Sequence, residues 1–312
     1  SSAASDVYKR QMYQPAKLTK AWRSEKMKEN RNWVVTGASG GIGAVLVEKL
    51  LEKGFRVAAL SRTPEKIEAR HGAQEGLRAI RVDVRSEESV LKAREEAKAF
   101  LGRVDVVVNT AGYGLGGAIE EVSDQEARAV FDVNVFGALN VCRHFVTDLR
   151  EQGGGCIINF ACMDSVIATG YNAVYHATKY AMDALTDALN KEAGQFGIRA
   201  ICVKNGPMRT DYLDNKQYAA EQLEVYQQAR QENRAREARY GAAAAADPGK
   251  VAELLIRLSG EEEVPKDLYL TRESVKAIRE KWDALEQEFE TWKWATLCVD
   301  FPKEECYFGK RN

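Results

Sequence analysis

Short apolar runs alternate with longer amphipathic stretches along most of this chain. The stretches carry helical periodicity and predict helices over Ile42–Lys53, Glu87–Leu101, Asp124–Leu149 and Asn172–Gln195. The apolar runs predict buried strands over Trp33–Thr36, Phe55–Leu60, Leu77–Val82, Val104–Asn109, Cys156–Phe160, Ile198–Val203 and Leu268–Leu270. Strands that alternate with helices are typical of a parallel sheet covered on both faces. We therefore predict an α/β fold with a doubly wound, parallel, seven-stranded sheet and helices on both faces.

Local signals mark further helix starts and the end of the regular pattern. Thr63-Pro64 combines an N-cap residue with proline at the first helical position, and Ser123 with Glu126 forms a capping box. The regular alternation of strands and helices ends at Thr210. Residues 211–246 are rich in Gln, Glu and Arg and predict a poorly amphipathic, helical, mobile flap over a site.

Composition divides the chain into three parts. Residues 1–31 are polar and basic without an apolar period, which predicts a disordered, targeting or artefactual extension. Residues 32–270 contain every predicted strand and form the predicted domain with its flap at 211–246. Residues 271–312 add a charged helix over Thr271–Trp292 and an aromatic tail. The tail is expected to pack back on the domain or to dock on a partner, and its aromatic residues are Trp292, Trp294, Phe301, Tyr307 and Phe308.

The overall charge and the cysteine pattern narrow the class of protein. Charged residues make up 29% of the chain and the net charge is −1, so nucleic acid and anionic membranes are not expected as main partners. No apolar run approaches the ~20 residues of a membrane span. The six Cys show no metal-ligand spacing and the three His are scattered, so we expect no metal site. Reduced thiols favour a reducing intracellular compartment, cytoplasmic or organellar.

A glycine-rich turn between the first strand and the first helix is the first candidate binding site. Glycines there let the backbone approach a pyrophosphate, and the helix N-terminus supplies unpaired N–H groups. In this strand–turn–helix context the turn predicts nucleotide binding, although a tight turn alone would also use glycine. The turn reads Thr36-Gly37-Ala38-Ser39-Gly40-Gly41-Ile42-Gly43.

The end of the second strand selects between two nicotinamide cofactors. An NAD(H) site has an acidic residue there that binds the ribose 2′-hydroxyl. This chain has Ser61-Arg62 instead. A guanidinium fits a 2′-phosphate, so the sequence favours NADP(H) over NAD(H). The alternative is that Arg62 is only a solvated loop residue.

Tyr175 and Lys179 form the candidate catalytic pair. Residues four apart on a helix lie on one face. A neighbouring ammonium favours the phenolate, so we expect Lys179 to lower the pKa of Tyr175. A phenol whose pKa is lowered in this way can exchange a proton with a carbonyl or an alcohol oxygen.

These motifs, together with others in the same order, resemble the short-chain dehydrogenase/reductase family in its compact, single-domain, Rossmann-like subgroup. The resemblance covers Asn32 to Leu270. It implies hydride transfer with a nicotinamide cofactor. The matching segments are Thr36–Gly43, Val82-Asp83-Val84, Asn109-Thr110-Ala111-Gly112, Val133-Asn134-Val135, Tyr175 with Lys179, and Asn205–Thr210.

The resemblance also assigns roles to individual residues. Tyr175 is implied as the acid/base, Lys179 as the residue that binds the nicotinamide ribose, and Asn134 as the residue that positions a water. The implied catalytic residues are Tyr175, Lys179, Asn134 and Cys162. The implied cofactor-binding residues are Gly37, Ser39, Gly41, Ile42, Gly43, Ser61, Arg62, Asp83, Val84, Asn109, Ala111, Gly112, Tyr175, Lys179, Gly206, Met208 and Thr210.

Position 162 departs from the family pattern. The family has a serine thirteen residues before the tyrosine, and this chain has Cys162. A thiol is a weaker donor than a hydroxyl, so reduced or lost activity is one interpretation. A redox-active thiolate stabilised near Lys179 is another, and Ser165 could also replace the missing donor.

The favoured hypothesis is an NADP(H)-dependent oxidoreductase that interconverts a carbonyl and an alcohol. The alternative is a catalytically weak or silent relative that binds nucleotide as a structural or sensing subunit, and isomerase or epimerase chemistry is a third option. The resemblance implies a homo-oligomer paired through the helices predicted at Asp124–Leu149 and Asn172–Gln195. An apolar small-molecule substrate is expected from the residues on its side of the site, Tyr113, Leu115, Tyr171, Met208, Tyr212 and Leu213.

Overall fold

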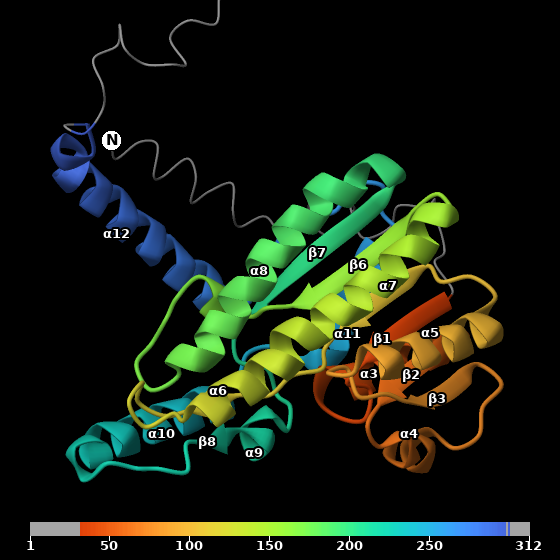
Figure 1. Cartoon of the computed structure of the whole chain (residues 1–312), viewed down its shortest axis with the longest axis horizontal. Helices are drawn as coiled ribbons and strands as arrows, with labels where there is room; N and C mark the ends of the chain where they lie inside the picture. The colour runs from red at the N-terminus through yellow and green to blue at the C-terminus, as the bar shows by residue number, and fades with distance from the viewer. Residues whose placement is uncertain (1–31, 298, 300–312) are drawn as a thin grey trace, which may run out of the picture.

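A seven-stranded sheet forms the centre of the computed structural model, which describes residues 32–297 and 299 (Figure 1). The strand order is β3-β2-β1-β4-β6-β7-β9, and every neighbouring pair is parallel. The predicted doubly wound sheet is therefore confirmed. Its strands are β1 (Asn32–Thr36), β2 (Arg56–Ser61), β3 (Leu77–Arg81), β4 (Val106–Asn109), β6 (Gly155–Phe160), β7 (Ile198–Asn205) and β9 (Asp267–Leu270).

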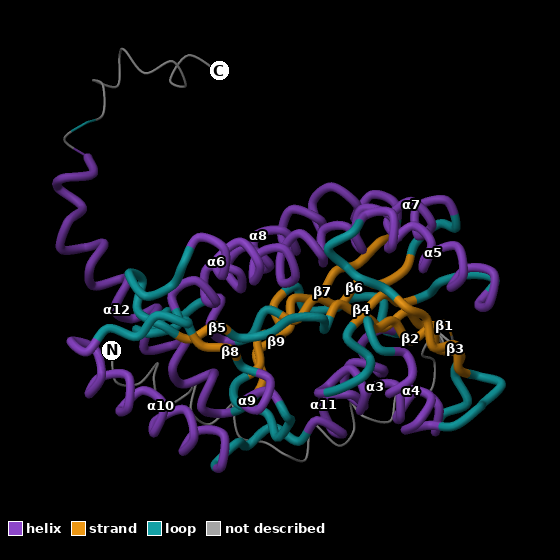
Figure 2. The backbone as a smooth tube through the Cα atoms, turned by 60° about the horizontal axis from the view of Figure 1, so that its bottom comes forward, coloured by secondary structure: helices purple, strands orange, loops and turns teal. Residues whose placement is uncertain are grey.

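Helices cover both faces of the sheet (Figure 2). One layer contains α5 (Glu87–Leu101), α7 (Ala138–Glu151) and α8 (Ala173–Ala193), and the other contains α3 (Gly41–Glu52) and α11 (Pro248–Ser259). Alternate residues of a strand point to opposite faces. Accordingly, Val34 packs in the cluster with Phe145 of α7, whereas Val35 packs in the cluster with Leu255 of α11. Burial on both faces explains why the strands read as continuous apolar runs.

The helix predicted over Asp124–Leu149 is interrupted. The structure has α6 (Asp124–Phe131), a π-helical turn η1 (Asp132–Gly137) and then α7. The predicted capping box is confirmed, because Ser123 and Glu126 exchange hydrogen bonds at the start of α6. Asn134 lies in the π turn. Such turns insert one extra residue into a helix and occur frequently at functional sites.

The region predicted as a flap contains several short elements. These are α9 (Tyr212–Asn215), β8 (Gln217–Tyr218), the 3₁₀ turn η4 (Glu224–Tyr226) and α10 (Gln227–Ala242). The sequence pattern predicted neither β8 nor its parallel partner β5 (Leu115–Gly116). A buried ion pair between Arg230 and Glu121 attaches the region to the domain. A second pair, Lys216 with Glu237 at 2.7 Å, joins two segments within the region. Polar rather than apolar residues of α10 face the core, which explains its weak hydrophobic periodicity.

Helix α12 (Arg272–Leu297) extends away from the domain (Figures 1 and 2). Its buried residues, Ser274 and Ile278, lie in the first two turns. Trp292 and Trp294 of the predicted aromatic tail are exposed, whereas Phe301, Tyr307 and Phe308 lie outside the described residues, as does the extension at 1–31. Docking through this tail stays a prediction. The remaining elements are α4 (Pro64–His71), η2 (Met163–Ser165) and η3 (Gly194–Phe196).

Within 32–297 and 299, no helix combines the length and apolarity needed to cross a bilayer.

The Arg230–Glu121 pair provides a test of how the flap is held. The Glu121 side chain is fully buried and also accepts backbone N–H bonds from Ala118 and Leu223. We expect Arg230→Met to lower the free energy of unfolding by about 3 kcal/mol, because it leaves a buried carboxylate without its cation. Urea denaturation at pH 7 measures this change. The exposed Arg239→Met on the same helix is the control and should change stability by less than about 0.5 kcal/mol; equal effects of the two variants would contradict the prediction.

Candidate active site

The glycine-rich turn is closely packed against the next loop. Gly37 has φ +66°, in the left-handed region that favours glycine, and Thr110 donates to the Thr36 carbonyl at 2.7 Å. A Cβ on Gly43 would lie 2.6 Å from the Gly37 carbonyl oxygen. Helix α3 begins at Gly41 without a side-chain cap. Its first N–H groups are therefore oriented for an anionic ligand.

Two arginines flank the predicted adenosine end of the site. Ser61 donates to Ser39 at 2.8 Å, and the next residue, Arg62, is exposed. Arg85 donates to the Asp83 carboxylate through Nε at 3.0 Å and through Nη2 at 2.6 Å. This hydrogen bonding lowers the pKa of Asp83. Sequence reasoning missed Arg85, although it stands only two residues after Asp83. The Asp83 carboxylate is thus neutralised within the protein.

Buried side-chain amides connect the strand ends to the catalytic helix. Thr36 donates to Asn109, which donates to Asn159 at 2.9 Å, and Asn159 donates to Thr186 of α8 at 3.0 Å. We call these four residues the polar row. Helix α8 also carries the candidate catalytic pair.

Asn134 is fixed by three hydrogen bonds. Its carbonyl accepts from the Tyr113 N–H, and its amide donates to the Tyr113 carbonyl, both at 3.0 Å, and to Thr178 of α8 at 3.1 Å. The π turn therefore orients Asn134 toward α8, the helix of Tyr175 and Lys179.

Tyr175, Lys179 and Cys162 lie together at the carboxyl end of β6. The Tyr175 hydroxyl lies 3.7 Å from the Cys162 sulfur, and the Lys179 ammonium lies 5.5 Å from the centre of the Tyr175 ring. The predicted lowering of the Tyr175 pKa is wrong for this structure. Burial raises that pKa well above its ordinary value, and Cys162, Tyr212 and Asp164 raise it further. Lys179 instead donates to the Phe160 carbonyl at 3.0 Å.

Cys162 adopts a strained backbone conformation, with φ 76° and ψ 171°. Residues other than glycine rarely occupy this region, at a cost of roughly 1–3 kcal/mol. Its thiol donates to Asp164 at 3.1 Å. The structure does not favour the redox-active thiolate, one of the interpretations of this position, because burial and then Asp164 raise the pKa of the Cys162 thiol. Ser165 does not replace the missing donor, since its hydroxyl is buried and donates to the Cys162 carbonyl at 2.9 Å.

His176 is buried beside Tyr175, with ring centres 5.8 Å apart. Its Nδ1 accepts the Thr169 N–H at 3.0 Å, which leaves Nε2 as the protonated nitrogen. Nε2 lies 3.5 Å from Asp164, and burial lowers the His176 pKa. The sequence did not suggest this polar contact between His176 and Asp164.

The flap places aromatic side chains against Tyr175. The rings of Tyr175 and Tyr212 have centres 6.0 Å apart, and the two hydroxyls are hydrogen-bonded. Tyr171 contacts Tyr226 edge-on. The backbone of Met208 forms an isolated parallel β-bridge with that of Ala246. Gly206, which is expected to contact the cofactor, packs closely against α12, since a Cβ there would lie 2.3 Å from the Ser274 hydroxyl; its role at the cofactor stays a prediction.

Two other features lie apart from this cluster. Asp183, Cys202 and Asp267 have metal-ligand spacing, but the buried Lys204 ammonium lies 2.8 and 3.0 Å from the two carboxylates. The Lys204 ammonium therefore already neutralises these two carboxylates.

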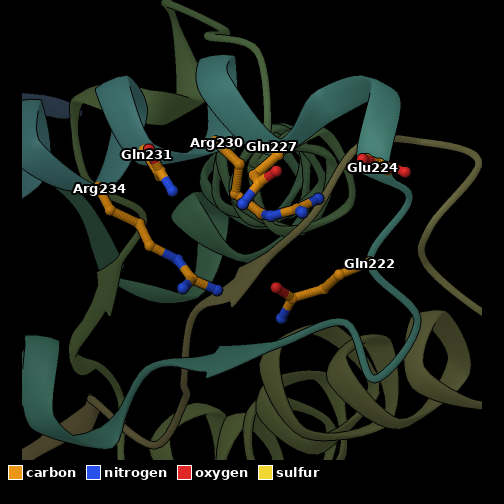
Figure 3. Close-up of a pocket in the computed structure, with 6 residues that line it drawn as sticks. All are labelled: Gln222, Glu224, Gln227, Arg230, Gln231 and Arg234. Carbon is orange, nitrogen blue, oxygen red and sulfur yellow. The ribbon is translucent and has the colours of Figure 1, made fainter.

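A polar pocket at the flap (Figure 3) contains none of the candidate catalytic residues. Its lining residues are Gln222, Glu224, Gln227, Arg230, Gln231 and Arg234.

Comparisons with known proteins agree with this arrangement. A family model described as short chain dehydrogenase matches residues 31–222. An uncharacterized oxidoreductase of Schizosaccharomyces pombe is 30% identical over 265 residues, which cover 83% of this chain and 88% of the relative. A 3-ketodihydrosphingosine reductase of Bacteroides thetaiotaomicron is 33% identical over 183 residues, or 59% of this chain and 66% of the relative. The crystal structure of a short-chain dehydrogenase from Streptomyces avermitilis has a TM-score of 0.77 and 28% identity, covering 86% of this chain and 98% of that one.

The packing of the turn predicts the effect of one added methyl group. We expect Gly43→Ala to weaken NADPH binding by roughly tenfold or more, because its Cβ would displace the Gly37 carbonyl and the N–H groups beside it. Quenching of tryptophan fluorescence on NADPH titration measures the affinity. Gly194→Ala is the matched control, since no atom lies within 4 Å of its added Cβ. Unchanged affinity in Gly43→Ala would show that the turn does not hold the nucleotide.

Proposed function

The chain belongs to the short-chain dehydrogenase family, and on that premise we propose that it is an NADP(H)-dependent oxidoreductase that interconverts a ketone and an alcohol. The observation that carries the proposal is the convergence of Tyr175, Lys179 and Asn134. Asn134 and Lys179 lie against Gly112, in the loop after β4 that packs on the glycine-rich turn. A silent nucleotide-binding subunit would not need this convergence. A rate reduced by Cys162 stays a prediction.

The chain's own residues supply the proton and the orientation. A bound nicotinamide would supply or accept the hydride. The raised pKa of Tyr175 keeps its phenol protonated at neutral pH, so the hydroxyl can donate to a carbonyl oxygen as negative charge develops there. Asn134 is held against α8 by Thr178, and Lys179 adds a positive charge close to the phenol. These residues favour reduction at neutral pH, and oxidation should accelerate as the pH rises.

The charges at the adenosine end support NADP(H). Arg62 is exposed at the end of β2, where a 2′-phosphate would lie in this fold. Arg85 neutralises Asp83, so the Asp83 carboxylate does not oppose a phosphate there.

The substrate side supports a ketone with apolar substituents. Tyr212 covers Tyr175, and Tyr113 and Tyr171 lie in the adjoining loops. The Bacteroides relative is named a 3-ketodihydrosphingosine reductase, and the reduction of a keto group is consistent with the proposed reaction.

Removal of the phenolic hydroxyl tests the proposed chemistry. We expect Tyr175→Phe to lower kcat for ketone reduction about 10²–10⁴-fold, because the proton donor is lost, while NADPH still binds. Oxidation of NADPH with a panel of ketones is followed at 340 nm. Tyr180→Phe is the matched control on the same helix, because its hydroxyl donates to the Val166 carbonyl and not toward the site. Equal rates in wild type and Tyr175→Phe would reject the assignment.

The cofactor preference is tested at Arg62. We expect Arg62→Ala to lower the NADPH-to-NADH ratio of kcat/KM at least about tenfold, since a charge-assisted bond to the 2′-phosphate is lost. Initial rates with each cofactor give the ratio. Arg70→Ala, an exposed arginine on α4, serves as the control. Equal use of NADH and NADPH by the wild-type enzyme would reject the NADP(H) assignment.

A further inference from the structure

A carboxylate lies beside the reactive hydroxyl, and the proposed mechanism does not use it. Asp164 accepts the Cys162 thiol proton at 3.1 Å, and the same sulfur lies 3.7 Å from the Tyr175 hydroxyl. The Asp164 side chain is 29% exposed, so a ligand can reach it. Its negative charge acts on the catalytic group, because it contributes to the raised pKa values of both Tyr175 and Cys162.

No cation neutralises Asp164 within the part of the chain that the structure describes. Its ion-pair partner there, His176, is neutral at pH 7, because burial lowers the His176 pKa. The two nearby lysines are engaged elsewhere. Lys179 donates to the Phe160 carbonyl, and Lys216 binds Glu237 and Asn172.

An unneutralised carboxylate at this position opposes the reduction of a simple ketone. Negative charge develops on the substrate oxygen in the transition state, and fixed charges nearby act strongly in a site that excludes water. A substrate that brings its own positive charge next to the reacting carbon would remove this penalty.

We propose that Asp164 binds a protonated amino group on the carbon next to the reacting carbonyl, so that the substrate is a 2-amino ketone and the product a 2-amino alcohol. This inference rests on the proposed oxidoreductase function. The nitrogen and the oxygen of a 2-amino ketone are separated by three bonds. The substrate oxygen can therefore lie at the Tyr175 hydroxyl while the ammonium lies at Asp164, on the two sides of the Cys162 sulfur. The reaction remains a hydride to carbon and a proton to oxygen, with the ammonium unchanged.

The test compares two substrates that differ only in the amino group. A secondary 2-amino alcohol and the same alcohol without the amino group are oxidised with NADP⁺ at pH 7, which avoids the self-condensation of amino ketones. For the wild-type full chain, we expect kcat/KM to favour the amino alcohol at least about tenfold, as for a charge-assisted bond. Asp164→Asn, nearly identical in shape, should abolish this preference, so that the kcat/KM ratio of the two alcohols falls to about one. Asp214→Asn, an exposed change on α9, is the control.

Each outcome separates this inference from the proposed function. If neither alcohol reduces NADP⁺, the oxidoreductase assignment itself fails. If both alcohols react and Asp164→Asn leaves their kcat/KM ratio unchanged, only the role of Asp164 is overturned. If Asp164→Asn does not fold, the pH dependence of the wild-type enzyme decides. The preference for the amino alcohol should then disappear as the pH rises through the amine pKa, and a preference independent of pH would overturn the inference.

Discussion

The polar row holds the architecture and the site together. Thr36, Asn109 and Asn159 are paired with one another by the strand register, and Asn159 continues the row to Thr186 of α8. All four side chains are buried, so each unpaired group would cost roughly 1–3 kcal/mol. The row therefore fixes three strands and one helix in a single relative position.

That position determines where chemistry can occur. Parallel pairing brings the carboxyl ends of β1, β4 and β6 to one edge, and the strand order reverses direction between β1 and β4. The glycine-rich turn follows β1, and Cys162 follows β6. Helix α8, which the row attaches to β6, brings Tyr175 and Lys179 to the same edge.

Much of this arrangement was predictable from the sequence, and the parts that were missed share a physical cause. Strands buried on both faces leave an apolar run, and the motif residues lie at their ends. In contrast, the Arg230–Glu121 pair joins residues 109 positions apart, and the π turn at Asn134 adds one residue without disturbing the capping signal at Ser123. The pKa of Tyr175 was predicted in the wrong direction because spacing reports a neighbouring Lys179 but not burial.

The carboxylate of Asp164, two residues later, gives a reason for the cysteine at position 162. A serine hydroxyl there would donate to Asp164 as a short, charge-assisted hydrogen bond, whereas a thiol is a weaker donor. The thiol therefore leaves more of the Asp164 charge available to a cation from outside. The strained backbone at Cys162 has the same consequence, because it directs the sulfur between Tyr175 and Asp164. If Asp164 binds the substrate as proposed, the cysteine predicted to replace the family serine would contribute to substrate selection.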